Sequence, residues 1–94
     1  IKVSGDKGIA IDTPDRNTLW QVQTPQVFSA DTIKSAYAKM YSSGEFDGVT
    51  DDAMVVEKYE KCGVRLVRSD YRNIKITTPE DMEIAGIFIR DIIA

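Results

Sequence analysis

The stretch that most constrains the fold of this chain is residues 71–81, which predicts a short strand running directly into a helix. Ile74 and Ile76 alternate with polar neighbours, as in a half-buried strand. Thr78 is a suitable N-cap and Pro79 stands at the first helical position, with an acidic residue three positions after the cap. A strand that leads into a helix is a building unit of α/β layer folds, so this class is the starting expectation.

The same junction predicts a place for an anion. Free backbone N–H groups and the helix dipole favour negative charge at a helix N-terminus. Ligands of open α/β sheets bind outside the carboxyl ends of the strands, and Lys75 lies just before this turn. Lys75 is therefore a candidate phosphate ligand. On spacing alone, the alternative is that Lys75 is a solvated surface charge.

Composition excludes several classes of protein. The chain has 94 residues, which allows one domain at most, and its net charge of −3 argues against a general nucleic-acid binder. No apolar run has membrane-spanning length and no signal peptide stands at the start. With no histidine, a His-based triad and His-ligated zinc are excluded; the single Cys62 cannot form an internal disulfide, which fits a reducing compartment. The first residue is Ile1 instead of Met, which predicts an excised piece of a longer protein.

The remaining patterns predict alternating strands and helices. Residues 1–12 predict a β-hairpin around a turn rich in glycine and small polar residues, and a lone hairpin needs something to pack against. Alternation and apolar clustering predict further strands at residues 19–23 and 64–67. Together with three helices, the order is hairpin, strand, helix, helix, strand, strand, helix, which predicts part of an α/β layer fold.

The three predicted helices have readable ends. Ser29 or Asp31 caps the first helix, whose apolar face is formed by Ile33, Ala36, Tyr37, Met40 and Tyr41. The second helix begins after Thr50 as its cap and stops at Gly63. The last helix, residues 79–93, has an apolar face too wide for a free surface helix, so we expect it to be mostly covered.

Four stretches of the chain together resemble a known enzyme family. They are TPDRNTLW (13–20), QTPQVF (23–28), TDDA (50–53) and NIKITTPED (73–81). In this order and at these separations they resemble the bacterial and plastid cytidylyltransferases that act on methylerythritol phosphate. The resemblance covers nearly the whole chain, but only the carboxyl-terminal part of the family's sequence.

The resemblance implies a fold and an assembly. The expected fold is the carboxyl-terminal part of a Rossmann-like α/β nucleotidyltransferase, with a protruding β-hairpin arm. Residues 1–18 would be a dimerisation arm that clasps the arm of a second subunit. Residues 19–94 would be the carboxyl-terminal portion of the cytidylyltransferase domain. The expected protein is a bacterial, cytoplasmic homodimer that binds neither nucleic acid nor membrane.

The resemblance also implies a reaction. The family transfers CMP from CTP to 2-C-methyl-D-erythritol 4-phosphate, with release of pyrophosphate, in isoprenoid precursor biosynthesis. The family's glycine-rich CTP loop and its magnesium-binding aspartate have no counterpart in these residues. Mg²⁺ is therefore expected as a cofactor whose ligands lie mostly outside this chain, and the chain by itself is expected to be inactive.

The resemblance places four substrate-binding residues, of which Arg16 and Lys75 are also the expected catalytic ones. Arg16 matches an arginine that reaches the substrate phosphate from the partner subunit, and Thr24 and Thr50 match substrate-contacting threonines. A sugar phosphate carries about two negative charges, which an arginine fork and a lysine point charge can neutralise. The alternatives are that Arg16 is a solvated turn residue, that Thr24 only shapes its turn, and that Thr50 only caps a helix.

One departure and two other functions remain to be weighed. The family can place a second metal-binding aspartate directly before Asn-Ile-Lys; this chain has Arg72 there and Asp70 nearby, which argues against a metal role for Asp70. Asp51 and Asp52 look like paired carboxylates, but first-turn acids are usually structural.

The alternative functions are a ribitol-5-phosphate cytidylyltransferase and a non-catalytic dimerisation module.

Overall fold

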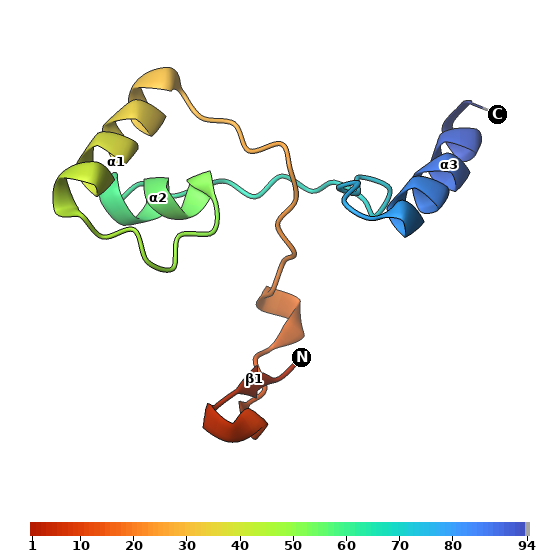
Figure 1. Cartoon of the computed structure of the whole chain (residues 1–94), viewed down its shortest axis with the longest axis horizontal. Coiled ribbons are helices and arrows are strands. Elements are labelled where there is room, and N and C mark those ends of the chain that lie inside the picture. The colour runs from red at the N-terminus through yellow and green to blue at the C-terminus, as the bar shows by residue number, and fades with distance from the viewer. Residues whose placement is uncertain (94) are drawn as a thin grey trace.

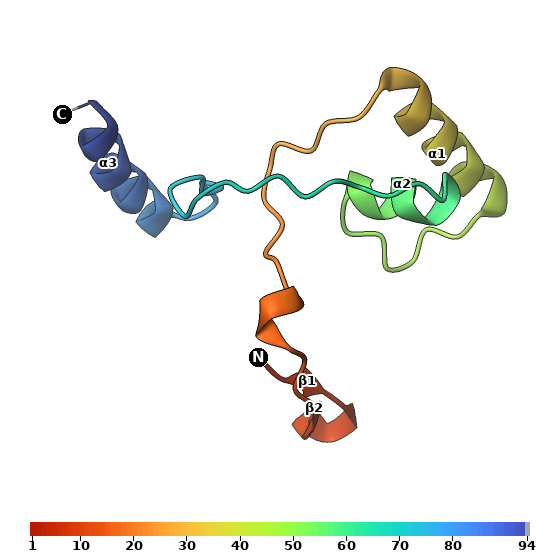
Figure 2. The ribbon, with the colours of Figure 1, turned by 180° about the vertical axis from the view of Figure 1, so that it is seen from behind.

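The computed structural model describes residues 1–93 and consists of three groups of elements joined by extended chain (Figure 1). In Figure 1 a pair of packed helices lies on the left, a third helix stands apart on the right, and a hairpin lies below the point between them. Figure 2 shows the same arrangement from behind. The radius of gyration is 17.5 Å, whereas a compact domain of this length would have about 12 Å. The elements are β1 (Val3–Ser4), β2 (Ala10–Asp12), α1 (Ala30–Ser43), α2 (Asp52–Tyr59) and α3 (Pro79–Ile93), with 3₁₀ turns at Asp6–Gly8 and Arg16–Thr18.

Helices α1 and α2 pack together and form the core. The Ser29 hydroxyl caps α1 by accepting from the backbone N–H of Thr32 at 3.3 Å, and Gly44 ends the helix in the left-handed conformation. The predicted first helix is therefore confirmed, with Ser29 as its cap. The buried side chains between the two helices are Ala36, Met40, Val55 and Val56. Tyr41 is 65% exposed, so the buried face of α1 is narrower than its apolar spacing predicted.

Both predicted ends of the second helix are wrong. Asp51, and not Thr50, is the N-cap of α2: its carboxylate accepts from the backbone N–H of Met54 at 2.9 Å. Aspartate is at least as good a cap as threonine, so the neighbouring carboxylate takes this position. The helix ends at Tyr59, before the predicted stop at Gly63. Lys61 adopts the left-handed conformation, φ 52°, that glycine often supplies just after a helix.

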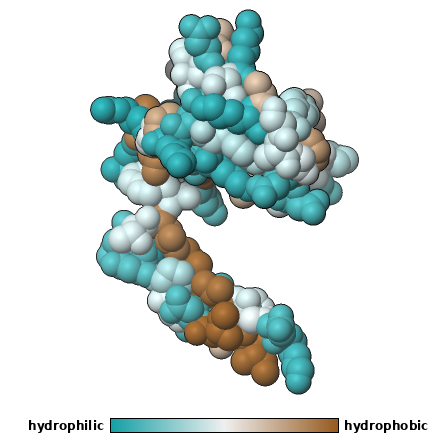
Figure 3. Space-filling view, turned by 90° about the vertical axis from the view of Figure 1, so that its left-hand side faces the viewer, coloured by the Kyte–Doolittle hydropathy of each residue, from teal (hydrophilic) through white to brown (hydrophobic). Residues whose placement is uncertain are grey.

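The predicted hairpin is confirmed. Strands β1 and β2 are antiparallel, and the turn between them passes through two residues with positive φ, Lys7 and Gly8. The apolar side chains of the hairpin remain between 40% and 67% exposed; they belong to Ile1, Val3, Ile9 and Ile11. Figure 3 shows the hairpin projecting away from the helices, with apolar residues gathered along it. The hairpin therefore has no packing partner among the described residues.

The other predicted strands are extended but unpaired. Residues 19–23, 64–67 and 74–76 belong to no ladder, because β1 and β2 form the one sheet found within residues 1–93. A strand requires a neighbour that completes its backbone hydrogen bonds, and no other segment of this part of the chain supplies one. Apolar side chains stay exposed as a result, Val67 to 80%. The expected α/β fold is thus present in part: residues 1–93 form three helices and a hairpin, without a central sheet.

Helix α3 begins at Pro79, as predicted, but it is not covered. None of its residues is buried, and no other described element packs closely against it. The prediction of a mostly covered helix is therefore wrong for residues 1–93. The exposed apolar side chains of α3 include those of Ile84, Ile87, Ile89 and Ile92. No helix in this part of the chain has both the length and the apolar character that crossing a bilayer requires.

Candidate functional site

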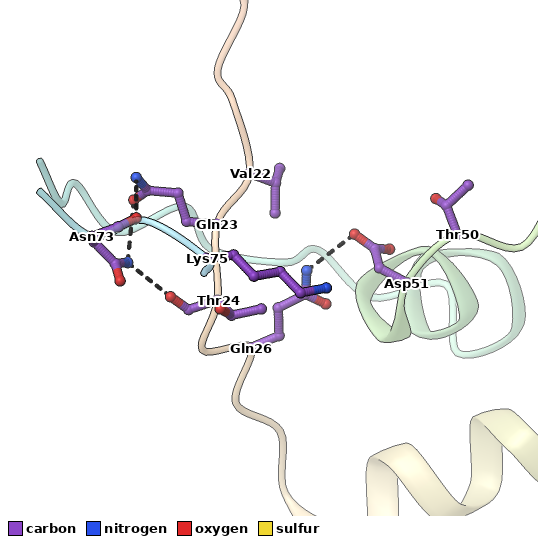
Figure 4. Close-up of a pocket in the computed structure, with 8 residues that line it drawn as sticks. All are labelled: Val22, Gln23, Thr24, Gln26, Thr50, Asp51, Asn73 and Lys75. Atoms are coloured by element: carbon purple, nitrogen blue, oxygen red, sulfur yellow. Dashed lines mark hydrogen bonds between the residues drawn. The ribbon is translucent and has the colours of Figure 1, made fainter. Parts of the chain in front are cut away.

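A polar pocket of about 380 Å³ lies where three segments of the chain meet. Figure 4 shows that its walls come from residues 22–26, from the start of α2, and from the segment that precedes α3. Three of the four predicted site residues line it together. The full lining is Val22, Gln23, Thr24, Gln26, Thr50, Asp51, Asn73 and Lys75.

Lys75 supplies the positive charge of this pocket. In Figure 4 its side chain extends across the pocket towards Gln26 and the start of α2. The described residues form three ion pairs, and Lys75 takes part in none of them. An exposed ammonium group that is not neutralised by a carboxylate is suited to bind an incoming anion as a point charge.

The two threonines line this pocket on different walls. The Thr50 hydroxyl donates to Met54 Sδ at 3.7 Å, and a thioether is a weak acceptor. Because Asp51 caps α2, the Thr50 hydroxyl is not needed for capping and remains able to bind a ligand. Thr24 is fixed through its backbone, since its carbonyl accepts from Asn73 Nδ2 at 2.8 Å. The pocket thus combines one cation with two hydroxyl groups.

Side-chain amides link the wall that carries Thr24 to the wall that carries Lys75. Gln23 Nε2 donates to the carbonyl oxygens of Asp70 at 3.1 Å and Asn73 at 3.0 Å, and Asn73 Nδ2 donates back to Thr24. No local sequence pattern assigns a role to Gln23 or Asn73. The available signal was their position inside two of the four family-like stretches.

A second amide link reaches the start of α2. Gln26 Nε2 donates to Asp51 Oδ2 at 3.0 Å, and Gln26 Oε1 accepts from the backbone N–H of Ala53 at 3.1 Å. The neighbouring Asp52 accepts a hydrogen bond from the Tyr37 hydroxyl, which raises the pKa of Tyr37. Both acids of the TDDA stretch therefore make structural hydrogen bonds, as expected for first-turn carboxylates.

Arg16 lies apart from the pocket of its own chain. It begins the 3₁₀ turn Arg16–Thr18 at the base of the hairpin, and its side chain is exposed. Asp15 shapes this turn by accepting from the backbone N–H of Asn17 at 3.0 Å. The structure therefore brings Thr24, Thr50 and Lys75 together within one chain and leaves Arg16 outside that group.

The described residues do not fit a magnesium site. Arg72 Nη2 pairs with Asp70 Oδ2 at 3.0 Å, and the Arg72 backbone N–H donates to Asp70 Oδ1 at 2.8 Å. The Arg72 guanidinium holds the pKa of Asp70 below its usual range, and the carboxylate is already bound, which agrees with the argument against a metal role. Nowhere in residues 1–93 do three or more His, Cys, Asp or Glu side chains gather so that they could hold a metal.

The N-terminus of α3 is capped by its own side chains. Asp81 Oδ2 accepts from the backbone N–H groups of Thr77 and Thr78, both at 3.0 Å, and the Thr78 hydroxyl accepts from the Asp81 N–H at 3.3 Å. The N–H groups of Thr77, Thr78 and Asp81 are therefore already bound within the chain and are not free for an anion. A carboxylate three residues after the cap already occupies the position, as in a capping box.

This capping predicts a dependence on pH. Hydrogen bonds from the Thr77 and Thr78 backbone N–H groups hold the pKa of Asp81 below its ordinary value of 3.8. Because the folded pKa is lowered, the stabilisation is complete above that ordinary value and is lost as the pH falls through the folded pKa. In an NMR titration from about pH 7 to pH 2, the amide signals of Thr77 and Thr78 should move together with a midpoint below 3.8. Asp81→Asn should abolish the step, and a midpoint at or above 3.8 would contradict the cap.

The chain is similar to known proteins over nearly its whole length. The profile of the family described as IspD, 2-C-methyl-D-erythritol 4-phosphate cytidylyltransferase, matches residues 1–91. The chain is 66% identical over 90 residues to the protein of this name from Lachnospira eligens, covering 96% of this chain and 40% of the relative. The identity is 49% over 90 residues for the protein of Caldanaerobacter subterraneus subsp. tengcongensis, covering 96% of this chain and 38% of the relative.

A relative from Geobacter metallireducens gives the same result, with 50% identity over 91 residues, 97% of this chain and 38% of the relative. The chain thus spans about 40% of the length of the curated relatives that it matches. The family-profile match extends from the hairpin through most of α3 and includes every residue of the pocket. The chain therefore belongs to the 2-C-methyl-D-erythritol 4-phosphate cytidylyltransferase family.

Proposed function

We propose that this chain is part of an enzyme that transfers CMP from CTP to 2-C-methyl-D-erythritol 4-phosphate and releases pyrophosphate, in isoprenoid precursor biosynthesis. The observation that carries the proposal is the pocket in which Thr24, Thr50 and Lys75 meet. Each of these residues comes from a different stretch of family-like sequence, and each presents a group suited to phosphate. The names of the related proteins support the same reaction.

In the proposed mechanism the protein mainly positions charges. An oxygen of the substrate phosphate attacks the α-phosphorus of CTP, and the bond from that phosphorus to the oxygen bridging it to the β-phosphorus breaks, so that pyrophosphate leaves. Lys75 and the partner subunit's Arg16 neutralise the attacking phosphate, while the Thr24 and Thr50 hydroxyls fix its orientation. A reaction of this kind needs no protein nucleophile, because positioning and charge stabilisation supply the acceleration.

The proposed architecture assigns residues 1–18 to a dimerisation arm and residues 19–94 to the carboxyl-terminal portion of a Rossmann-like α/β domain. The exposed apolar hairpin supports the first assignment. The unpaired extended segments 64–67 and 74–76 support the assignment to an α/β domain. They have the sequence pattern of strands, and their backbone groups lack the hydrogen-bond partners that a neighbouring strand would provide. The proposed Mg²⁺ would be held mainly by residues beyond this chain. The proposed compartment is the bacterial cytoplasm, where the co-substrate CTP is made.

The proposed function predicts a sharp difference between the full-length enzyme and residues 1–94. With CTP, Mg²⁺ and 2-C-methyl-D-erythritol 4-phosphate, the full-length enzyme should release pyrophosphate, whereas residues 1–94 should give no more than a blank without protein. The physical reason is that no glycine-rich phosphate loop exists in this sequence to bind CTP.

Ribitol 5-phosphate should be the poorer substrate in the same pyrophosphate assay, judged by kcat/KM. A full-length enzyme that prefers ribitol 5-phosphate would replace the proposed substrate with the alternative one. A full-length enzyme that accepts neither compound would contradict the proposed function. Turnover by residues 1–94 alone would show that the site is complete in this chain, contrary to the proposal.

A further inference from the structure

One side chain makes the hydrogen bonds between two walls of the pocket. Thr24 belongs to an extended segment and Thr50 precedes α2, and no ladder connects these segments. Within residues 1–93, the hydrogen bonds between residues 22–29 and residues 49–54 all come from the Gln26 amide. Figure 4 shows this side chain directed at Asp51, beside Thr50. Phe28 also packs on the helix core further along the same segment, but the polar link beside the two threonines comes from Gln26.

The chemistry of this link requires both ends of the amide. Gln26 Nε2 donates to the Asp51 carboxylate, and a hydrogen bond to a charged group is roughly twice as strong as a neutral one. Gln26 Oε1 accepts from Ala53, whose N–H lies in the first turn of α2 and has no acceptor within the helix. Both hydrogen bonds are partly buried, which favours a fixed geometry.

We propose that Gln26 is a positioning residue for the sugar-phosphate site, fixing the Thr50 wall against the Thr24 wall. The inference rests on the proposed function for its substrate. Gln26 acts through Asp51 and the start of α2, and it transfers no proton or phosphoryl group. Misplacement of a substrate-orienting group by about 1 Å costs about 100-fold in rate, so loss of this link should be visible in kinetics.

The pair of Gln26 and Asp51 allows a test by exchange of roles. Gln26→Glu keeps the size of the side chain but removes the donor and sets a second carboxylate against Asp51. Asp51→Asn keeps a good helix cap but removes the acceptor of the Gln26 amide. Combining the two substitutions rebuilds an amide–carboxylate hydrogen bond with the donor on the opposite side, and the net charge of the pocket is unchanged.

The experiment measures kcat and KM for both substrates in the full-length enzyme. Gln26→Glu should lower kcat/KM for 2-C-methyl-D-erythritol 4-phosphate by about 10- to 100-fold, and Asp51→Asn should also lower it. The double variant should recover to within several-fold of the unchanged enzyme. KM for CTP should stay constant throughout. Gln21→Ala, an exposed glutamine of the same segment that does not line the pocket, is the matched control and should have no effect.

Two kinetic results would overturn the inference. A double variant as impaired as Gln26→Glu would mean that Gln26 does not act through Asp51. An equal change of KM for CTP, accompanied by a lower melting temperature, would mean a general loss of structure.

Failure of the proposed function is recognisable separately, because the unchanged enzyme would then transfer no CMP to this substrate. In that case, hydrogen exchange at the Ala53 amide decides. Exchange should accelerate in Gln26→Glu, because repulsion from the Asp51 carboxylate moves the substituted side chain away from the Ala53 N–H. It should slow again in the double variant, and unchanged exchange would overturn the link.

Discussion

Lys75→Ala in the full-length enzyme is expected to lower kcat/KM for the sugar phosphate by about 10- to 100-fold, the loss that follows from about 1.5–3 kcal/mol for a hydrogen bond to a charged group. Lys75 provides the pocket's ammonium group and has no ion-pair partner within the described residues. Thr50→Ala should cost less, because a hydroxyl contact lacks the charge on the protein side.

The control for this prediction is Lys34→Ala, which removes an exposed lysine of α1 that does not line the pocket. It should leave kcat/KM unchanged. If Lys75→Ala stayed within about threefold of the unchanged enzyme, the loss would be under about 1 kcal/mol and the phosphate role would be wrong. A loss in Thr50→Ala larger than that in Lys75→Ala would contradict the proposed ranking.

The second large effect is expected from the hairpin arm, defined as residues 1–18. Its apolar side chains are exposed, its edges offer unpaired backbone groups, and an isolated two-stranded hairpin is marginally stable in water. We therefore expect the chain to self-associate through the arm about a two-fold axis. Light scattering at tens of micromolar should give twice the 10.5 kDa chain mass. Deletion of residues 1–11 should give a monomer whose helices persist by circular dichroism.

The arm also predicts a result for mixed subunits. Arg16 lies outside the pocket of its own chain, and the proposed site takes it from the partner. Full-length Arg16→Ala and Lys75→Ala should each be impaired, yet their co-expression should restore activity. Random pairing makes half of the dimers mixed, each with one intact site of two, so about a quarter of the sites recover.

Two outcomes would contradict the arm. A constant mass of one 10.5 kDa chain across the concentration range would rule out self-association of this chain. Co-expressed variants with no more activity than either variant alone would mean that Arg16 does not complete the partner's site. The control is co-expression of Lys34→Ala with Lys75→Ala, in which about half of the sites carry an intact lysine.

Elements with local signals could be predicted from the sequence. The hairpin follows from its turn residues, α1 from its cap and helical spacing, and the start of α3 from the Thr78-Pro79 pair. The strand that the sequence predicts at residues 64–67 does not form among the described residues. A strand depends on a neighbour that residues 1–93 do not supply, so correct alternation still gives no ladder.

The candidate site also has parts that the sequence predicts and parts that it does not. Thr24, Thr50 and Lys75 stand in short family-like stretches, and they do meet in one pocket. The hydrogen bonds from Gln26 to Asp51 and from Asn73 to Thr24 join residues that are 25 and 49 positions apart in the sequence. No local sequence pattern therefore predicts them. The start of α3 shows another limit of prediction from sequence. A helix terminus looks open to an anion until the side chain that closes it is placed.

The packing of α1 on α2 has a consequence for the motion of the pocket. This helix pair contains the buried core, whereas the walls that carry Thr24 and Lys75 are extended chain held by side-chain amides. Segments with few buried apolar contacts open at low free-energy cost, and packed helices open last. We expect the Thr50 wall to stay fixed and the two walls that carry Thr24 and Lys75 to move. Phosphate would draw Lys75 and Thr24 inward against a stationary helix end.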